Sequence, residues 1–361
     1  MKRFLFGWLF CLPILLQAQQ VSTVTTLNAA IAETSGLIQL DGKFITHNDS
    51  GNEPTLYEID TLTGSIDRVV LVRSANNVDW EDICKDDTYI YIADIGNNNG
   101  SRTDLKVYRI KIEDYQNYDT VSAETIAFSY SDQTNFTPAP LNTNFDAEAI
   151  IAYNDSLYIF TKNWINNRTN IYALSKLPGI YSIGKVDDFW ANGLVTGADY
   201  NPETGVVILS GYSLIFPFII EIENIEGHAF SAADRKRYNI TVNQSVQIES
   251  IAAINYFQYY MTAEAGTGGS AALYRLNTDQ VLSDVNHLFP EQSFYPNPSS
   301  NFIKIEGEDS IKVLIYDNNG SLMMITTEHE IDVSTLDKGL YFVTIMTNDS
   351  NDAVVRKLVV E

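Results

Sequence analysis

Short apolar runs alternate with polar, glycine- and asparagine-rich stretches along most of the chain. Five segments share one order: a small or acidic start, a short apolar strand, a turn, a second strand rich in Tyr, Ile or Val, a Gly/Asn-rich loop and a third strand. Runs of β-branched and aromatic residues bounded by turn formers predict strands rather than helices. The five segments are residues 34–60, 79–110, 146–175, 195–222 and 247–276.

A self-similar unit of roughly 40–50 residues made of short antiparallel strands is typical of a propeller blade. The sequence therefore predicts an all-β fold that begins with a β-propeller. Five blades are favoured, and six are the alternative because residues 124–132 form a further strand-like run. Residues 19–27 are expected to supply the outer strand of the last blade and so close the ring. A run of hairpins in a β-sandwich is the competing fold, but it does not explain the acid that recurs at strand starts.

The N-terminus has the pattern of a secretory signal peptide. Lys2 and Arg3 precede an apolar run from Phe4 to Leu16, and Ala18 is the expected last residue before cleavage. The apolar run is too short to span a bilayer. We therefore expect a signal peptide at 1–18, a propeller domain at 19–290, a C-terminal domain at 291–361, and no transmembrane segment in the mature chain.

Prolines and strand-like runs mark the second domain. Pro296 and Pro298 punctuate its start, and Asn319-Gly320 separates two apolar runs in the manner of a hairpin turn. Residues 339–347 and 354–361 are predicted as further strands. The expected fold is a small antiparallel β-sandwich.

This second domain carries "YPNP", "IYDNNG", "IDVSTLDKGLYFVTI" and "VVRKLVV" in that order. With these motifs it resembles the C-terminal sorting domain of type IX secretion system cargo of Bacteroidetes. The resemblance implies that residues 294–361 contact the type IX secretion machinery. It also implies that the protein is secreted, or held at the outer cell surface, after crossing the outer membrane.

Charge and cysteine content limit the partners. The chain has 46 acidic and 23 basic residues and a formal net charge of −23. Such a protein repels nucleic acid and anionic membranes, and it suits a divalent cation or a cationic partner. Cys84 is the only cysteine outside the signal peptide, so no internal disulfide is expected, and we expect it to be a small buried apolar residue.

Acids recur near the starts of the predicted first strands. Because first strands line the central channel of a propeller, these carboxylates are expected to meet near its axis. Like charges at close range need a cation, hydrogen bonds or water. An all-oxygen set suits Ca²⁺ better than zinc, whereas the alternative is that each carboxylate accepts backbone N–H bonds from a neighbouring blade. The candidate metal ligands are Glu81, Glu148, Asp199 and Glu249, with Gly36 at the corresponding place in the first unit.

The loops after the second strands are expected to gather on one face of the disc. Candidate catalytic residues there are His47 and Asp49 as base or ligand, Asp94, and Lys162 as an anion binder. Asn98, Tyr212 and Glu264 belong to the same set. For single residues, the competing interpretation is that these Asx- and Gly-rich stretches only build turns. The sequence shows no G-x-S-x-G elbow, phosphate-binding glycine loop or Cys/His metal spacing.

The propeller part also resembles a group of exported bacterial proteins of undefined activity. The resemblance is carried by "SGL" at 35–37, "THNDSG" at 46–51, "DWEDI" at 79–83, "ADIGNN" at 93–98, "DAEAI" at 146–150, "LYIFTK" at 157–162 and "VTGAD" at 195–199. Two positions depart from the group: Asn97 stands where an acid is usual, and Phe145 where a His is frequent.

Two functions compete at this stage, and the sequence does not decide whether the protein is an enzyme. The first is an exported or surface-displayed binding module for a small molecule or glycan, with a structural Ca²⁺. The alternative is a metal-dependent hydrolase of lactones or phosphoesters, in which axial acids hold the metal and His47 or a loop acid moves protons. The first is favoured because Gly36 breaks the ring of acids and no dedicated base is evident.

Overall fold

The computed structural model describes nine stretches of the chain, the first of which begins at Gln19. The predicted signal peptide at 1–18 and the predicted turn at Asn319-Gly320 lie outside them. None of the helices in these stretches is both long and apolar enough to cross a membrane. The described residues are 19–213, 216–241, 247–255, 257–265, 269–278, 294–305, 311–317, 322–347 and 350–361.

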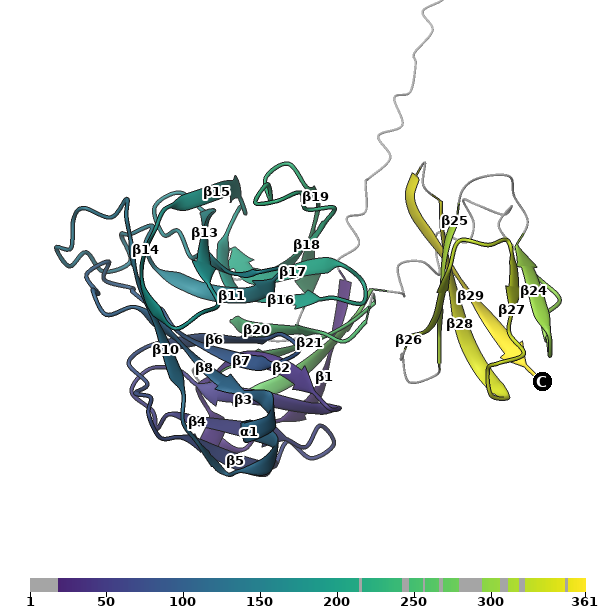
Figure 1. Cartoon of the computed structure of the whole chain (residues 1–361), viewed down its shortest axis with the longest axis horizontal. Coiled ribbons are helices and arrows are strands. Elements are labelled where there is room, and N and C mark those ends of the chain that lie inside the picture. The colour runs from purple at the N-terminus through teal and green to yellow at the C-terminus, as the bar shows by residue number, and fades with distance from the viewer. Residues whose placement is uncertain are drawn as a thin grey trace, which may run out of the picture.

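The described residues before the second domain form five four-stranded units, which we also call sheets; a shared N-terminal strand joins the fourth and fifth into one eight-stranded sheet. Figure 1 shows the units as one group of strands. The first sheet contains β2 (Thr34–Leu40), β3 (Lys43–Asn48), β4 (Thr55–Ile59) and β5 (Ile66–Val72). The second contains β6 (Trp80–Lys85), β7 (Tyr89–Asp94), β8 (Lys106–Lys111) and β10 (Glu124–Tyr130). A short helix, α1 (Ile112–Asn117), follows β8. The strand-like run at 124–132 is therefore the outer strand of the second sheet, because β10 pairs with β8, and it does not start a sixth blade.

The remaining sheets repeat this plan. The third contains β11 (Ala147–Tyr153), β12 (Ser156–Thr161), β13 (Arg168–Ser175) and β15 (Lys185–Trp190). The fourth contains β16 (Leu194–Asn201), β17 (Val206–Ser213), β18 (Phe216–Glu223) and β19 (Asp234–Thr241). The fifth contains β20 (Ile248–Ala253), β21 (Gln258–Ala263), β22 (Ala272–Asn277) and β1 (Gln19–Thr26).

The first strands of the five sheets form a closed inner ring. Strand β2 packs against β6, β6 against β11, β11 against β16, β16 against β20, and β20 returns to β2. Inner strands such as β6 are buried along most of their length, whereas the outer strand β5 alternates between exposed and buried residues. The fold is thus all-β and propeller-like with five blades, and the competing sandwich does not describe this part of the chain.

Edge strands cross between neighbouring sheets at the outside of the ring. Strand β9 (Thr120–Val121) pairs in parallel with β5 of the first sheet, and β14 (Gly179–Ile183) pairs in parallel with β10 of the second. Strand β1 pairs antiparallel with β22 and, through Gln19 and Gln20, in parallel with β19. The N-terminal run therefore closes the ring, as the sequence predicted.

Buried carboxylates tie the inner strands together. The Asp82 carboxylate on β6 accepts hydrogen bonds from the backbone N–H groups of Ile150 on β11 (2.9 Å) and Ala198 on β16 (3.2 Å). The Asp199 carboxylate accepts one from Ala253 on β20 (2.8 Å). Because these amides belong to other blades, each carboxylate links inner strands that share no backbone ladder with each other.

The second domain has two sheets. One contains β23 (Phe294–Tyr295), β24 (Phe302–Ile305) and β27 (Glu330–Asp332). The other contains β25 (Ile311–Tyr316), β26 (Leu322–Thr326), β28 (Gly339–Thr347) and β29 (Ser350–Val360). Ile303 and Ile331 from the first sheet share a core with Val313, Val343 and Leu358 from the second. The predicted antiparallel sandwich is confirmed.

Candidate functional site

The inner strands share a local irregularity at one end of the channel. In each, the pairing with the second strand shifts by one residue, so that one residue per blade is left out of the ladder as in a β-bulge. The residues left out are Gly36, Glu81, Glu148, Thr196 and Glu249. Three of the four predicted metal ligands thus occupy matching positions, and Thr196 stands where Asp199 was expected.

Gly36 cannot be replaced by an acid without rearrangement. Its φ is +66°, and a Cβ at this position would lie 2.7 Å from Nε2 of His47 and 2.8 Å from the backbone N of Ile83. Both the left-handed backbone and the lack of space require glycine. The first blade therefore contributes no carboxylate from its bulge.

A pocket of about 320 Å³ lies at this end of the channel. Its wall combines many carboxylates with one basic side chain among the described residues, Lys162. The acids are Glu33, Asp49, Glu81, Glu148, Glu249 and Glu264; the other lining residues are Thr34, Ser35, Asn98, Leu141, Trp164, Tyr212 and Gln247. We call it the mouth pocket.

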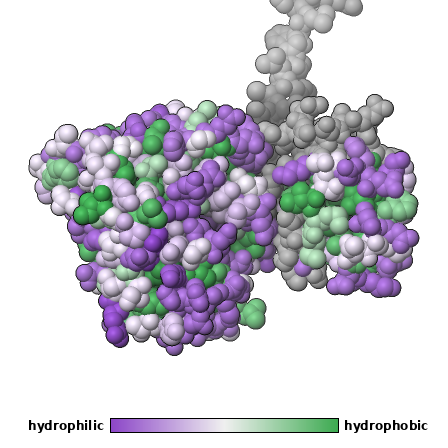
Figure 2. All heavy atoms as spheres, in the orientation of Figure 1, coloured by the Kyte–Doolittle hydropathy of each residue, from purple (hydrophilic) through white to green (hydrophobic). Residues whose placement is uncertain are grey.

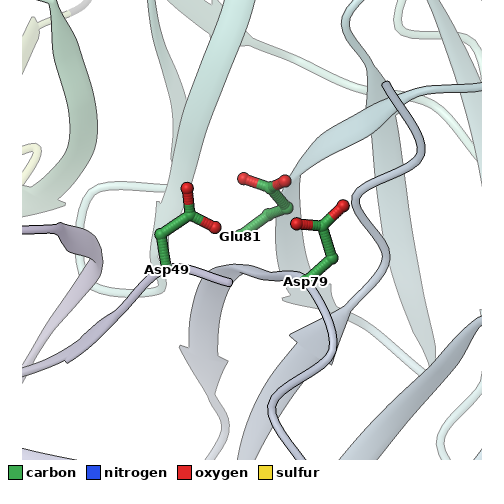
Figure 3. Close-up of side chains that lie close together, drawn as sticks. All are labelled: Asp49, Asp79 and Glu81. Carbon is green, nitrogen blue, oxygen red and sulfur yellow. The ribbon is translucent and has the colours of Figure 1, made fainter. Parts of the chain in front are cut away.

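Three carboxylates converge at its edge. One oxygen from each of Asp49, Asp79 and Glu81 lies within 4.8 Å of the others, and Figure 3 shows the three groups pointing into a common space. Asp49 follows β3, whereas Asp79 and Glu81 flank Trp80 at the start of β6. The backbone of Gly96 borders them closely, since a Cβ there would lie 2.1 Å from Oε1 of Glu81.

Glu81 is the most deeply buried member of this group. Glu81 is 5% exposed. Within the described part of the chain, no group donates a hydrogen bond to its carboxylate or forms an ion pair with it. Burial, and then the charge of Glu148, raises the pKa of Glu81 well above its ordinary value. An uncompensated buried carboxylate is unfavourable, so the site favours a proton or a cation here.

The neighbouring acids show the same effect. Burial raises the pKa of Asp49 to about 6 and that of Asp79 to about 6; the charge of Arg102 opposes the shift of Asp79, and like charges nearby add to both shifts. Burial also raises the pKa of Glu249 to about 8, although Lys162 opposes the shift. The mouth pocket therefore carries more negative charge than its own cation neutralises.

Lys162 is buried among these acids. Its Nζ lies 3.0 Å from Oε2 of Glu148, 5.1 Å from the centre of the Trp164 ring and 5.5 Å from that of Tyr212. Burial by itself lowers the pKa of Lys162, but Glu148 and Glu249 raise it well above the ordinary value. Lys162 is thus a fixed ammonium held by a carboxylate and two aromatic rings.

Asp146 and Trp164 fix one wall of the pocket. The Asp146 carboxylate accepts hydrogen bonds from the indole N–H of Trp164 (2.7 Å) and the backbone N–H of Asn97 (2.7 Å). The side-chain amide of Asn97 donates to the carbonyl of Phe145 and accepts from the backbone N–H of Arg102. Its amide thus holds two loops together.

Two predicted catalytic residues do not line the mouth pocket. His47 is completely buried with its ring edge-on to Trp80, and burial lowers its pKa to about 4. Asp94 is also buried, and it accepts from Arg102 (2.8 Å) and from the backbone N–H of Asp79 (3.1 Å). Asp49 and Lys162, by contrast, do line it.

Asp199 lies at the other end of the channel. It lines a separate pocket of about 470 Å³ together with Lys85, Lys176 and Glu203. Its carboxylate accepts backbone N–H bonds from Tyr200 and Ala253, and burial raises its pKa to about 6. The alternative of backbone-bonded axial carboxylates therefore applies to Asp82 and Asp199, whereas Glu81, Glu148 and Glu249 face the mouth pocket.

Sequence analysis missed several members of the site. Asp79 stood in the "DWEDI" motif, and Asp146 in "DAEAI", but no spacing rule separated them from turn-forming acids. Leu141 and Trp164 carried no polar signal at all. Their roles depend on the fold of residues 131–146, where Ala139 and Leu141 donate backbone hydrogen bonds to Asn99 and Asn98.

The family comparison concerns the second domain. Residues 293–361 match the family described as the secretion system C-terminal sorting domain. The match supports export as cargo of the type IX secretion system, contact with its machinery, and a location outside the cell or at its surface. No curated protein matches the chain. The described chain thus combines an all-β, propeller-like ring with a C-terminal domain that matches a sorting domain of exported proteins.

Solved structures resemble the chain only distantly. PorZ, a bacterial surface component of the type IX secretion system of Porphyromonas gingivalis, is 14% identical with a TM-score of 0.36; the alignment covers 91% of this chain and 45% of PorZ. An exo-β-1,3-galactanase variant from Phanerochaete chrysosporium with β-1,3-galactotriose is 10% identical with a TM-score of 0.42, over 93% of this chain and 98% of that one. The chain thus spans less than half the length of PorZ, and these scores carry no argument about ligands.

Proposed function

We propose that this protein is an exported binding module that holds a divalent cation, Ca²⁺, in the mouth pocket. The observation that supports this most directly is the convergence of Asp49, Asp79 and Glu81. Two oxygens that share a Ca²⁺ at about 2.3–2.6 Å lie at most about 5 Å apart, and the three carboxylates meet that limit. Glu81, whose buried carboxylate has no hydrogen bond or ion pair among the described residues, then gains a cation in direct contact.

The chemistry of the group favours calcium over a transition metal. The donors are carboxylate oxygens, and the buried imidazole of His47 lies outside the mouth pocket lining. Hard oxygen donors suit Ca²⁺ or Mg²⁺, and Ca²⁺ tolerates irregular geometry supplied by loops. The proposed ligand set therefore differs from the ring of four acids expected from the sequence.

Calcium titration of the full chain, followed by thermal unfolding, tests this proposal. A cation bound only by the folded state stabilises it by about 2.7 kcal/mol at ~100 times Kd. Glu81→Gln should remove most of the rise in melting temperature, because it removes the buried anionic ligand. Glu203→Gln, which removes an exposed charge at the opposite pocket, is the matched control and should keep the rise. An identical melting curve with calcium and with chelator would contradict the proposal.

A second candidate function is a metal-dependent hydrolase of lactones or phosphoesters. Glu249 favours it, because burial raises the pKa of this carboxyl to about 8 in the cation-free pocket, and a carboxyl whose pKa lies near neutral pH can act as a general acid or base. Calcium-dependent turnover of p-nitrophenyl phosphate or gluconolactone that falls about 100-fold in Glu249→Gln would support it. Binding of calcium without turnover of either substrate would exclude the hydrolase and support the binding module.

A further inference from the structure

An exposed leucine lies at the edge of the otherwise polar mouth pocket. Leu141 is 55% exposed, and its φ is +54°, a conformation that branched L side chains rarely adopt. Its backbone N–H donates to the carbonyl of Asn98 (2.9 Å), which holds the residue in place. An unfavourable conformation that presents an apolar side chain at a pocket edge indicates a contact with a ligand.

Trp164 adds a second apolar surface whose orientation is fixed. The bond from its indole N–H to Asp146 sets the ring plane, and the ring is half-buried in the pocket wall. The rest of the wall offers hydrogen-bonding groups: the ammonium of Lys162, the amides of Asn98 and Gln247, and carboxylates. The pocket thus combines a small apolar surface with many donors and acceptors.

We propose that the ligand of the mouth pocket is a neutral sugar ring of an oligosaccharide. A pyranose has a C–H face, which packs on Leu141 and Trp164, and an edge of hydroxyls, which bond to Lys162, the carboxylates and the bound cation. This inference rests on the proposed function, because the cation supplies positions for hydroxyl oxygens. A volume of about 320 Å³ is in the range of small-molecule sites and leaves the rest of the oligosaccharide outside.

Charge separates this ligand from two others. Six carboxylates against one lysine disfavour an acidic sugar, since even a bound divalent cation leaves the wall net negative. Lys162 already occupies the position where an organic ammonium would contact both aromatic rings, within 5.5 Å of the two ring centres and 3.0 Å from Glu148. A neutral polyhydroxylated ligand meets neither obstacle.

The test uses the full chain on an array of neutral, uronic-acid and amino oligosaccharides, in calcium chloride and in chelator. The strongest neutral binder is then titrated by calorimetry. Leu141→Ala should weaken its binding about tenfold while the calcium-induced rise in melting temperature stays unchanged. Leu177→Ala, which truncates a leucine that is 64% exposed and outside the pocket lining, is the matched control and should bind as the unchanged chain does.

The outcomes separate this inference from the proposed function. A calcium-induced rise in melting temperature without binding of any neutral saccharide overturns the proposal of a sugar ligand and supports the calcium site. Binding of acidic or amino sugars alone also overturns it, as does equal binding by Leu141→Ala and Leu177→Ala. Binding of a neutral sugar that depends on Leu141, by a protein whose melting temperature does not respond to calcium, supports the sugar and overturns the calcium site.

Discussion

The acids around the channel differ in what compensates their charge. Asp82 and Asp199 accept hydrogen bonds from backbone N–H groups, and Glu148 forms an ion pair with Lys162. Asp49, Asp79 and Glu81 share a small space in which each carboxylate lies close to the other two, although the charge of Arg102 partly compensates Asp79. At the scale of single residues, this difference decides which carboxylates hold the chain together and which are available to a cation.

The raised pKa values make a prediction about pH. In the cation-free protein, stability should fall as pH rises from about 4 to about 8, because burial raises the pKa of Asp49 and Asp79 to about 6 and that of Glu249 to about 8. Between the ordinary and the raised value, the folded state binds more protons than the unfolded state, and that stabilisation is lost as pH passes the folded pKa. Melting temperatures of dialysed protein at several pH values measure this.

Calcium should change that pH profile. Binding displaces protons, so the rise in melting temperature on adding calcium should be larger at pH 8 than at pH 5. Asp49→Asn should flatten the cation-free profile near pH 6. A cation-free melting temperature that increases steadily over this range would contradict the assignment of these groups.

At the scale of elements, the inner strands are held by contacts outside the sheet ladders. Besides the bonds of Asp82 and Asp199, the Ser35 hydroxyl donates to the carbonyl of Glu81, and the Thr196 hydroxyl to that of Ile248. Each bond joins one inner strand to that of a neighbouring blade. The polar residues of the channel therefore fix the relative positions of the blades, while apolar clusters fill the space between them.

Asp82→Ala should be strongly destabilising. It leaves the amides of Ile150 and Ala198 without their acceptor, and each unsatisfied buried group costs about 1–3 kcal/mol. Chemical denaturation should show a loss of about 3 kcal/mol or more, with a smaller loss for Asp82→Asn, which keeps an acceptor oxygen. Asp155→Ala, at an exposed turn, should change the free energy of unfolding by less than about 0.5 kcal/mol. Equal effects of Asp82→Ala and Asp155→Ala would refute the linking role.

For the whole molecule, the main requirement is closure of the ring. Strand β1 covers the edge of β22 over Val21–Thr26, so the last sheet is completed by the first residues of the described chain. Figure 1 shows β1 beside the strands of the fifth sheet. Its colour differs from theirs because β1 lies near the N-terminus. On the face drawn in Figure 2, hydrophilic residues cover much of the described surface and hydrophobic ones are interspersed, as suits an exported acidic protein.

Removal of residues 19–26 should open the ring. The truncated chain loses the ladder to β22 and exposes an unpaired edge, which costs about 5 kcal/mol if each of roughly five lost pairs contributes about 1 kcal/mol. Thermal unfolding and size-exclusion chromatography should show a lower melting temperature and association. A synthetic peptide of residues 19–27 added in trans should restore part of the stability by strand addition. Unchanged melting of the truncated chain would show that closure does not depend on β1.

Much of the architecture followed from local pattern. Strand-forming runs, the N-terminal closing strand and the C-terminal sandwich could be predicted, because strand propensity and turn residues act between neighbours in the chain. Glu81, Glu148 and Glu249 could be matched across blades for the same reason. The fourth position was assigned to Asp199 instead of Thr196, three residues away, because the bulge that sets which residue faces the mouth pocket leaves no mark in the sequence.

The strands, their grouping into blades and the sorting signal could thus be read from residues that are close together in the chain. The convergence of Asp49 and Asp79, thirty residues apart, with Glu81 became visible only in the folded protein, as did the common pocket of Leu141, Trp164 and Lys162. These meetings arise from the register of the inner strands and from loops of different blades. Strand register and loop positions depend on contacts between different blades, which form only when the ring closes.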